Sequence, residues 1–311
     1  MRTGIVSTSI LCIPLLQYLQ SAKEDYCVFL AEQPGSGNDV VASFCTTAGI
    51  SCTHEKNSGQ SLYDWVNTLQ PEIVFVVSYN RVIRLNRFTN YAPQFYNVHF
   101  GHLPEYRGPN PVFWQLKNGA HSLAITIHCI SEQLDAGAIA WKKEYKNEPF
   151  FSYGYTNQLM SYYLVEGVNY LLQLHKQKAI VPVTVQDEKQ AVYFEKPAAR
   201  DVCIDWKTMH ASVICALVKA CNPWNNGAIT TYNGFEVRII DAEPIAANGN
   251  LTHPPGAIID TSSAFLVSCI NNGVVQLHSL MVNCVLMPAR FAANYGFVKG
   301  QSFNNIENAG I

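Results

Sequence analysis

The sequence predicts an α/β protein in which a parallel β-sheet is followed by a small β-barrel. In the first half of the chain, short β-branched runs alternate with segments of helical period. This alternation is typical of a parallel sheet with right-handed helical crossovers. In the last third, short alternating strands are separated by Gly, Asn and Pro turns, which favours a small barrel. The 311 residues are 48% hydrophobic and 14% charged, so the chain as a whole is not disordered.

The first half begins with a strand over residues 4–7 and a helix from about residue 12 to 20. The alternative, a secretory signal, is disfavoured because polar residues interrupt the apolar stretch and Pro14 lies inside it. Further strands are expected over residues 26–31 and 73–77. No apolar run reaches the roughly 18 residues of a membrane span, so we expect a soluble, cytoplasmic protein.

The second half begins with a long Tyr- and Leu-rich helix over residues 151–176. An extended stretch with two prolines follows, and we interpret residues 179–198 as a linker between domains 1–178 and 199–311. The second domain is expected to contain a helix over 209–219 and strands over 228–232, 236–240, 265–270 and 274–280. The aromatic surface around residues 153–170 is either core or a homodimer contact, and periodicity does not separate the two.

The net charge and the cysteine spacing disfavour several classes of partner and of site. The net charge of −2 disfavours a polyanionic partner. None of the ten cysteines forms a CxxC pair, which removes the usual zinc and dithiol signatures and favours buried thiols in a reducing compartment. The run 33–39, Gln-Pro-Gly-Ser-Gly-Asn-Asp, contains GxG without the rest of a dinucleotide fingerprint, so we interpret it as a plain loop. No metal site is expected.

The most informative segment is Tyr-Asn-Val-His-Phe-Gly-His-Leu-Pro-Glu-Tyr-Arg-Gly-Pro-Asn-Pro, residues 96–111. A strand that enters this loop places Asn97 and His99 on one face, because side chains alternate with period two. They would emerge at the carboxyl end of a strand, where open α/β sheets bind ligands. Asp135 lies just before a small-residue turn. Converging Asn, His and Asp side chains can perform acyl-type transfer, because the amide and imidazole stabilise an oxyanion while the carboxylate orients the imidazole or takes a proton.

Three ordered blocks carry a resemblance: Asn97-Val98-His99, then Leu-Pro-Glu-Tyr-Arg-Gly at 103–108, then Leu-Asp-Ala-Gly at 134–137. They resemble the signature of the formyltransferases that use N10-formyltetrahydrofolate. The similarity extends to residues 75–83, which resemble the folate-binding half of the family. Residues 204–206 and 220–228 resemble the carboxyl-terminal domain of methionyl-tRNA and sugar N-formyltransferases. The resemblance implies a Rossmann-like formyltransferase domain in residues 1–178, a folate cosubstrate and an OB-like domain in residues 199–311.

The resemblance also implies roles for individual residues. Asn97 and His99 would polarise the formyl oxygen, and Asp135, paired with His99, would help to remove the proton of the attacking amine. The residues implied in binding the folate are Tyr79, Arg81, Val82, Ile83, Leu134, Ala136 and Ala138. Those implied in binding the acceptor are His102, Leu103, Pro104, Tyr106, Arg107 and Gly108.

Two departures from the family pattern bear on the acceptor. Gly101-His102 stands where relatives usually have Ser-Leu, and His102 either faces the acceptor or is simply solvated. The loop after the second strand has no Lys or Arg, whereas tRNA-directed members carry a basic insertion there, and a tRNA acceptor should leave clustered basic residues. The basic run 81–87 is a solvated face, or it meets the folate tail or an acceptor phosphate.

We therefore predict transfer of a formyl group to a small amine acceptor, and we favour a nucleotide-linked amino sugar as that acceptor. The alternatives are methionyl-tRNA, a peptide or secondary-metabolite amine, or a folate-binding protein without turnover. His128 is interpreted as a packed or edge histidine rather than a ligand, Trp114 as core rather than a stacking platform, and the turn at 222–224 as structural.

Overall fold

The computed structural model describes residues 1–311 apart from 32–36, 57–59, 89–90, 247–252 and 307–311. The predicted loop 33–39 falls largely outside the described residues. The chain forms two compact units, which we describe separately. Unit 1 comprises Met1–Pro111, Ser122–Lys146 and Asn157–Phe194, and unit 2 comprises Val112–His121, Asn147–Thr156 and Glu195–Ile311.

Unit 1 is built on a seven-stranded sheet with the order β3-β2-β1-β4-β5-β6-β7. The strands are β1 (Thr3–Ser7), β2 (Tyr26–Leu30), β3 (Cys52–His54), β4 (Ile73–Val77), β5 (Gln94–His99), β6 (Ser122–Cys129) and β7 (Ile139–Lys146). The first five are parallel, as predicted. The predicted Rossmann-like parallel sheet is confirmed for these strands, and β6 and β7 extend it as antiparallel strands. Residues 130–138 between them are too few for a helical crossover. The sheet is Rossmann-like and mixed.

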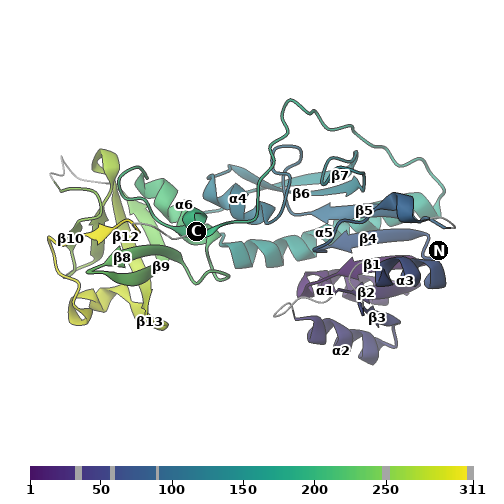
Figure 1. The fold of residues 1–311 in the computed structure, drawn as a ribbon, viewed down its shortest axis with the longest axis horizontal. Coiled ribbons are helices and arrows are strands. Elements are labelled where there is room, and N and C mark those ends of the chain that lie inside the picture. Colours follow the sequence, from purple (N-terminus) through teal and green to yellow (C-terminus); the bar gives the residue numbers. More distant parts are fainter. Residues whose placement is uncertain (32–36, 57–59, 89–90, 247–252, 307–311) are drawn as a thin grey trace. The chain divides into compact units, whose positions relative to one another are not determined.

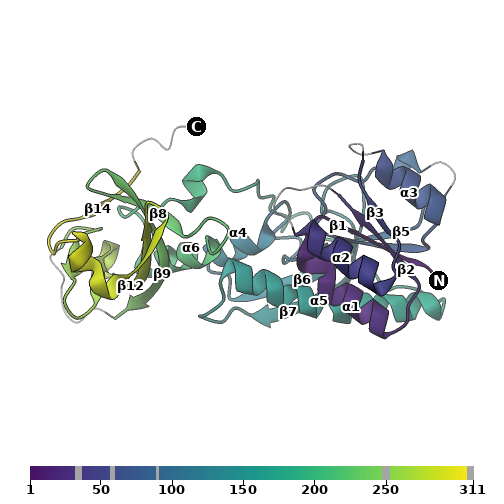
Figure 2. The same cartoon turned by 90° about the horizontal axis from the view of Figure 1, so that it is seen from below.

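Helices cover both faces of this sheet (Figure 2). They are α1 (Ile13–Ser21), after the 3-10 turn Ile10–Cys12, then α2 (Asn38–Ala48), α3 (Ser61–Leu69) and α5 (Tyr153–Lys176). Side chains of β4 alternate between the faces, as period two requires. Val74 packs in the core cluster with Trp65 of α3. On the other face, Phe75 stacks on Tyr96, whose hydroxyl lies 3.1 Å from the His175 ring of α5.

After α5 the chain returns along the sheet (Figure 1). We call residues 179–194 the return segment. Its Thr184 exchanges two backbone hydrogen bonds of 2.8 Å with Ile139 at the start of β7. Its end pairs with the loop that follows β5, because the Arg107 N–H donates to the Val192 carbonyl at 3.0 Å and the Phe194 N–H donates to the Arg107 carbonyl at 2.9 Å. The return segment is therefore part of unit 1, and residues 195–198 are part of unit 2.

Unit 2 contains a curled antiparallel sheet with the order β10-β11-β12-β9-β8-β14, with β13 on β12, so the predicted small antiparallel barrel-like domain is confirmed. Its elements are α4 (Pro111–Lys117), which begins at the last residue of unit 1, α6 (Ala211–Ala220), β8 (Ala228–Tyr232), β9 (Phe235–Ile245), β10 (Ile258–Asp260), β11 (Phe265–Ser268), β12 (Val274–Val282), β13 (Val285–Pro288) and β14 (Phe303–Asn304). Asn222 donates to the Val218 and Ile240 carbonyls at 2.7 Å, which is a structural role. Trp114 is buried and donates to the Glu195 carbonyl at 2.9 Å.

Within the described ranges, no helix is both long and apolar enough to span a membrane. The ten cysteines are all unpaired thiols, and six are fully buried or nearly so, while Cys284 is exposed. Among the described residues, no group of three or more His, Cys, Asp or Glu side chains is arranged to hold a metal ion.

Candidate active site

Two antiparallel neighbours, β5 and β6, bring the first polar side chains together. Asn97 of β5 lies directly opposite His128 of β6 in the register, so their side chains share one face of the sheet. His99 follows two residues after Asn97 and lies on that same face. Asp135 reaches the cluster from the loop between β6 and β7, with a left-handed backbone at φ +54°. The three residues predicted as catalytic therefore converge, together with His128.

Hydrogen bonds fix the orientation of the His128 ring. The Asn97 side-chain amide lies 3.2 Å from the Asp135 carboxylate (Nδ2 to Oδ1) and 3.1 Å from the His128 ring (Nδ2 to Nε2). The His128 Nδ1 lies 2.9 Å from the Cys129 carbonyl, which only accepts, so the proton of the neutral ring sits on Nδ1. His128 Nε2 then accepts from Asn97. His128 is thus packed, as the sequence suggested, and it also holds a site residue, which the sequence interpretation missed.

Asp135 is held as a carboxylate. Its side chain is only 6% exposed, and its Oδ2 accepts the Gly108 N–H at 2.9 Å. Burial raises the pKa of this carboxyl, but the His99 and His128 rings and the Gly108 N–H outweigh burial and lower the pKa to about 2. Asp135 therefore carries its negative charge throughout the neutral range.

His99 is a buried imidazole with two different surroundings. Its Nε2 lies 2.7 Å from the Tyr106 carbonyl and donates to it, while its Nδ1 lies 3.7 Å from Asp135 Oδ2. Burial lowers the pKa of His99, and the charge of Asp135 only partly opposes this. The neutral ring that results carries its proton on Nε2, so the unprotonated Nδ1 faces a carboxylate. A proton that reached Nδ1 would gain the attraction of that carboxylate.

Two glycines allow the loop after β5 to pass this close to the cluster. Gly108 has φ +98°, and a Cβ there would lie 2.0 Å from the Phe194 carbonyl oxygen. A Cβ at Gly101 would lie 2.6 Å from His99 Nε2. The Gly101 that departs from the family pattern therefore leaves room for the His99 ring as it lies here.

The return segment fastens both loops of the site through one buried amide. Gln186 Oε1 accepts from the Arg107 guanidinium at 3.1 Å (Nε) and 3.0 Å (Nη2). Gln186 Nε2 donates to the Asp135 carbonyl at 2.8 Å and to the Gly137 carbonyl at 2.7 Å. Arg107 also binds Glu188 at 2.7 Å and 3.0 Å. The Arg107 side chain, predicted to bind acceptor, thus faces the return segment.

Gln186 and Glu188 are further residues that the sequence interpretation missed. The pattern Val183-Thr184-Val185-Gln186 points to buried valines, yet Val183 is 51% and Val185 83% exposed while Gln186 is buried. The Gln186 amide is buried because it forms hydrogen bonds with two buried carbonyls and a buried cation. These partners are distant in the sequence, so no local sequence pattern predicts the burial of Gln186.

His102 lies in a group of charged side chains on the loop after β5. Its Nδ1 is 2.7 Å from Glu105 Oε2 and 3.1 Å from Lys142 Nζ, and its Nε2 is 3.0 Å from Glu144 Oε1. Burial lowers the pKa of Lys142, opposed by Glu105 and Glu144. Leu103 and Pro104, also predicted to bind acceptor, are buried, and Tyr106 stacks on Phe194 with ring centroids 5.4 Å apart.

The residues predicted to bind folate lie in two places. After β4, the Arg81 guanidinium bonds the buried Glu55 at 3.1 Å, Ile83 is in the core cluster, and Val82 is exposed. Burial raises the pKa of the Tyr79 phenol beside Glu55. Next to Asp135, the apolar Leu134 is exposed, while Ala136 and Ala138 are partly buried.

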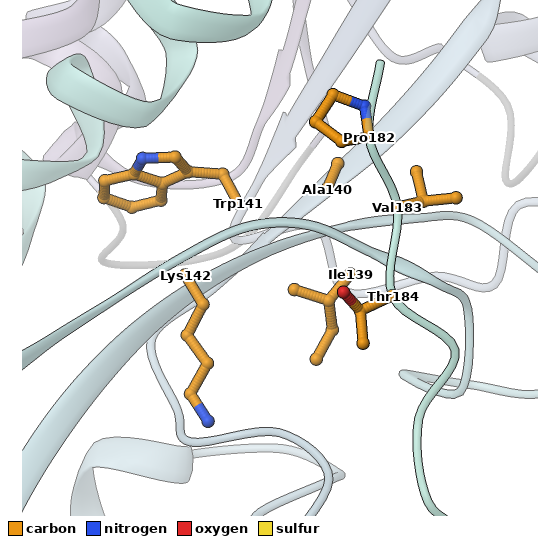
Figure 3. A pocket seen from close by; sticks show the side chains of 7 residues that line it. All are labelled: Ile139, Ala140, Trp141, Lys142, Pro182, Val183 and Thr184. Atoms are coloured by element: carbon orange, nitrogen blue, oxygen red, sulfur yellow. The ribbon is translucent and has the colours of Figure 1, made fainter. Parts of the chain in front are cut away.

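An open hollow lies beside the start of β7 (Figure 3). It contains about 770 Å³ of space that includes open solvent. Its lining residues are Ile139, Ala140, Trp141, Lys142, Pro182, Val183 and Thr184. None of them belongs to the cluster around Asp135, so we assign no chemistry to this hollow.

The fold and the buried Asn-His-Asp cluster are those expected of a formyltransferase, and comparison with known proteins agrees with this class. Residues 19–149 match the family described as formyl transferase, and residues 198–294 match the formyl transferase C-terminal domain. The chain belongs to the formyl transferase family.

Individual relatives are more distant. A methionyl-tRNA formyltransferase of Fervidobacterium nodosum is 31% identical over 194 residues, which cover 62% of this chain and 60% of that protein. The match thus spans about three-fifths of that relative's length. In fold, the chain is similar to a Helicobacter canadensis N-formyltransferase solved with folinic acid and dTDP-3-aminofucose, with TM-score 0.70, 15% identity and coverage of 88% of this chain and 98% of that one. It is also similar to HypX from Aquifex aeolicus in complex with tetrahydrofolic acid, with TM-score 0.65, 18% identity and coverage of 97% and 48%.

Proposed function

We propose that this protein transfers the formyl group of N10-formyltetrahydrofolate to a primary amine. The observation that carries the proposal is the buried pair of a charged Asp135 and a neutral His99, adjoined by the partly exposed Asn97 amide. Family membership supports the reaction class, because the matched regions include both the formyl transferase domain and its C-terminal domain.

Each side chain has a task in such a transfer. An aliphatic ammonium has a pKa near 10 and attacks only after it has lost a proton. The unprotonated Nδ1 of His99 accepts that proton, and Asp135, 3.7 Å away, stabilises the imidazolium that forms. The Asn97 amide donates to the negative charge that develops on the carbonyl oxygen of the group being transferred. The new bond joins the amine nitrogen to the formyl carbon. The bond from that carbon to the folate nitrogen breaks, and the folate nitrogen leaves with the electron pair and takes up the second proton that the amine nitrogen loses, which gives tetrahydrofolate.

The residues beside Asp135 and those after β4 offer apolar contacts to the flat faces of a folate ring. Leu134 and Val82 expose apolar side chains, and a Cβ at Gly137 would lie 1.7 Å from the Cys129 carbonyl oxygen, so the chain beside Leu134 is packed tightly against β6. Tyr79, Arg81, Ile83, Ala136 and Ala138 stay candidates for the same site. The cosubstrate supplies the activated formyl group. Solved relatives in complex with folinic acid or tetrahydrofolic acid support this choice.

For the acceptor we propose a small nucleotide-linked amino sugar. The net charge of −2 argues against a tRNA, whose phosphates require a basic surface. A relative in fold solved with dTDP-3-aminofucose supports a sugar acceptor. The second candidate is methionyl-tRNA, because the curated relative with 31% identity is a methionyl-tRNA formyltransferase.

The test measures tetrahydrofolate release from N10-formyltetrahydrofolate by purified protein, with dTDP- and UDP-linked amino sugars, with methionyl-tRNA, and with no amine. Tetrahydrofolate release that depends on a nucleotide-linked amino sugar supports the proposal. Release only with methionyl-tRNA, with a steep salt dependence, selects the second candidate. Release without amine indicates a hydrolase, and no release while folate still binds indicates a folate-binding protein.

A matched pair of variants assigns the chemistry. Asn97→Ala is expected to lower kcat by about 100-fold, the usual cost of removing one oxyanion donor, and to spare folate binding. Asn118→Ala makes the same change at an exposed position and is expected to leave kcat unchanged. Unchanged turnover in Asn97→Ala would remove Asn97 from the mechanism.

A further inference from the structure

The return segment pairs the exposed Tyr193 with the loop whose backbone holds the Asn-His-Asp cluster. Arg107 and Tyr193 are bridge partners in a parallel pairing, so their side chains lie on the same side of the local ribbon. Arg107 precedes Gly108, whose N–H holds Asp135 at 2.9 Å. The next residue of the return segment, Phe194, stacks on Tyr106, whose carbonyl holds His99. Two consecutive residues of this segment thus contact Arg107, which precedes the N–H that holds Asp135, and Tyr106, whose carbonyl holds His99.

The position of Tyr193 is well determined by its neighbours. Three backbone hydrogen bonds join residues 192–194 to the loop after β5, at 3.2 Å, 3.0 Å and 2.9 Å. Six residues before Val192, Gln186 binds the Asp135 and Gly137 carbonyls. A side chain on this segment is therefore held in place relative to Asp135 by contacts on both sides of it.

The Tyr193 side chain is 53% exposed, and in the parts of the chain that the structure describes no hydrogen-bond partner faces its hydroxyl. Burial raises the pKa of this phenol and the negative charge of Asp135 raises it further, against a smaller opposite effect of Arg107. The hydroxyl therefore stays protonated throughout the neutral range, in which Asp135 is charged, and it can donate or accept a hydrogen bond there without titrating.

We propose that Tyr193 is a specificity-determining residue whose hydroxyl hydrogen-bonds the amine acceptor beside the nitrogen that is formylated. This inference rests on the proposed function and deepens it by assigning one wall of the acceptor site to the return segment. Leu134 and Val185, which precede Asp135 and Gln186 in the sequence, are exposed apolar side chains as well. A polar acceptor such as an amino sugar presents hydroxyl and amine groups, which are the partners that a phenol hydroxyl accepts from and donates to.

The first measurement compares Tyr193→Phe with Tyr162→Phe, which makes the same change at an exposed position of α5. One net hydrogen bond is worth about 0.5–1.5 kcal/mol, which is a factor of about 2 to 13. Tyr193→Phe is expected to raise the KM for the accepted amine by about 2- to 13-fold and to leave the KM for N10-formyltetrahydrofolate unchanged. Tyr162→Phe is expected to change neither. An unchanged amine KM in Tyr193→Phe, or a raised folate KM instead, overturns the inference.

A second measurement does not need turnover. The protein is labelled with 13C at the tyrosine Cζ, and the Tyr193 resonance is identified by its loss in Tyr193→Phe. We expect it to shift when dTDP-linked amino sugar or methionyl-tRNA is added to the complex with 5-formyltetrahydrofolate, and not when the folate alone is added. A shift without turnover would retain the assignment of Tyr193 and reject the proposed function. A shift caused by folate alone, or no shift with either amine, overturns the inference.

Discussion

Gln186→Met tests whether the return segment positions the cluster. Methionine keeps the length of the side chain and removes all four hydrogen bonds of the amide: two from Arg107, at 3.1 Å and 3.0 Å, and two to the Asp135 and Gly137 carbonyls, at 2.8 Å and 2.7 Å. Volume is nearly conserved, so the effect reports on hydrogen bonding rather than on a cavity.

The magnitude follows from what is left unpaired. A buried polar group that loses its partner costs about 1–3 kcal/mol, and here two buried carbonyls each lose a donor. Arg107 keeps Glu188, so its loss is smaller. We expect the free energy of unfolding to fall by about 2–4 kcal/mol. Because the Asp135 loop loosens, we also expect kcat to fall by about 10- to 100-fold, the cost of displacing a catalytic group by about 1 Å.

The assays are urea unfolding and tetrahydrofolate release, each with Gln190→Met as the control. Gln190 lies on the same segment but is exposed, so its replacement is expected to change the free energy of unfolding by less than about 0.5 kcal/mol. Gln186→Glu keeps acceptor oxygens for Arg107 and loses both bonds to carbonyls, so it isolates the effect on Asp135. If Gln186→Met retained wild-type stability and kcat, the return segment would not position the cluster.

Three further predictions concern ionisation and backbone shape. The pKa of Asp135 is about 2 in the folded protein against an ordinary 3.8, so its charge contributes about 2 kcal/mol to the free energy of unfolding at pH 7. Since the pKa of Asp135 is lower in the folded than in the unfolded state, this contribution is lost on acidification. Between pH 7 and pH 3, the free energy of unfolding of the wild type should fall by about 1 kcal/mol relative to that of Asp135→Asn. A difference between the two proteins that does not change with pH would contradict this prediction. The His99 imidazole, assigned by its loss in His99→Asn, should titrate by NMR below pH 6.5 because burial lowers its pKa, and a midpoint above that value would argue against a neutral ring. Gly108→Ala should lower the free energy of unfolding by more than about 3 kcal/mol, because its Cβ would meet the Phe194 carbonyl. The control Gly119→Ala is also at positive φ but has no atom within 4 Å of the new Cβ, so it should cost about 1–2 kcal/mol. Equal losses in the two variants would refute the steric argument.

Hydrogen bonds orient the side chains of the Asn-His-Asp cluster in advance of ligand binding. The Asn97 amide joins His128 to Asp135, and the Tyr106 carbonyl sets the tautomer of His99. Each ring nitrogen therefore has one assigned role before any ligand arrives. Preorganisation of this kind lets a buried site stabilise developing charge without reorientation during the reaction.

Local patterns in the sequence determined the strands and the identity of the central residues. β-branched runs between Gly and Pro turns located β1, β2 and β4, since such runs favour extended backbone and burial. Period two on β5 put Asn97 and His99 on one face, and the three ordered motifs identified Asp135 as their partner.

Only the tertiary structure decided which other side chains join them. His128 enters the cluster through the antiparallel register of β5 and β6, which period two on a single strand does not specify. Gln186 and Tyr193 belong to the return segment, which we interpreted from the sequence as part of a linker because it is an extended stretch of mixed polarity between two prolines. Its buried face is set by unpaired carbonyls and a cation on other loops, and the free energy of satisfying buried polar groups depends on contacts that sequence periodicity does not contain.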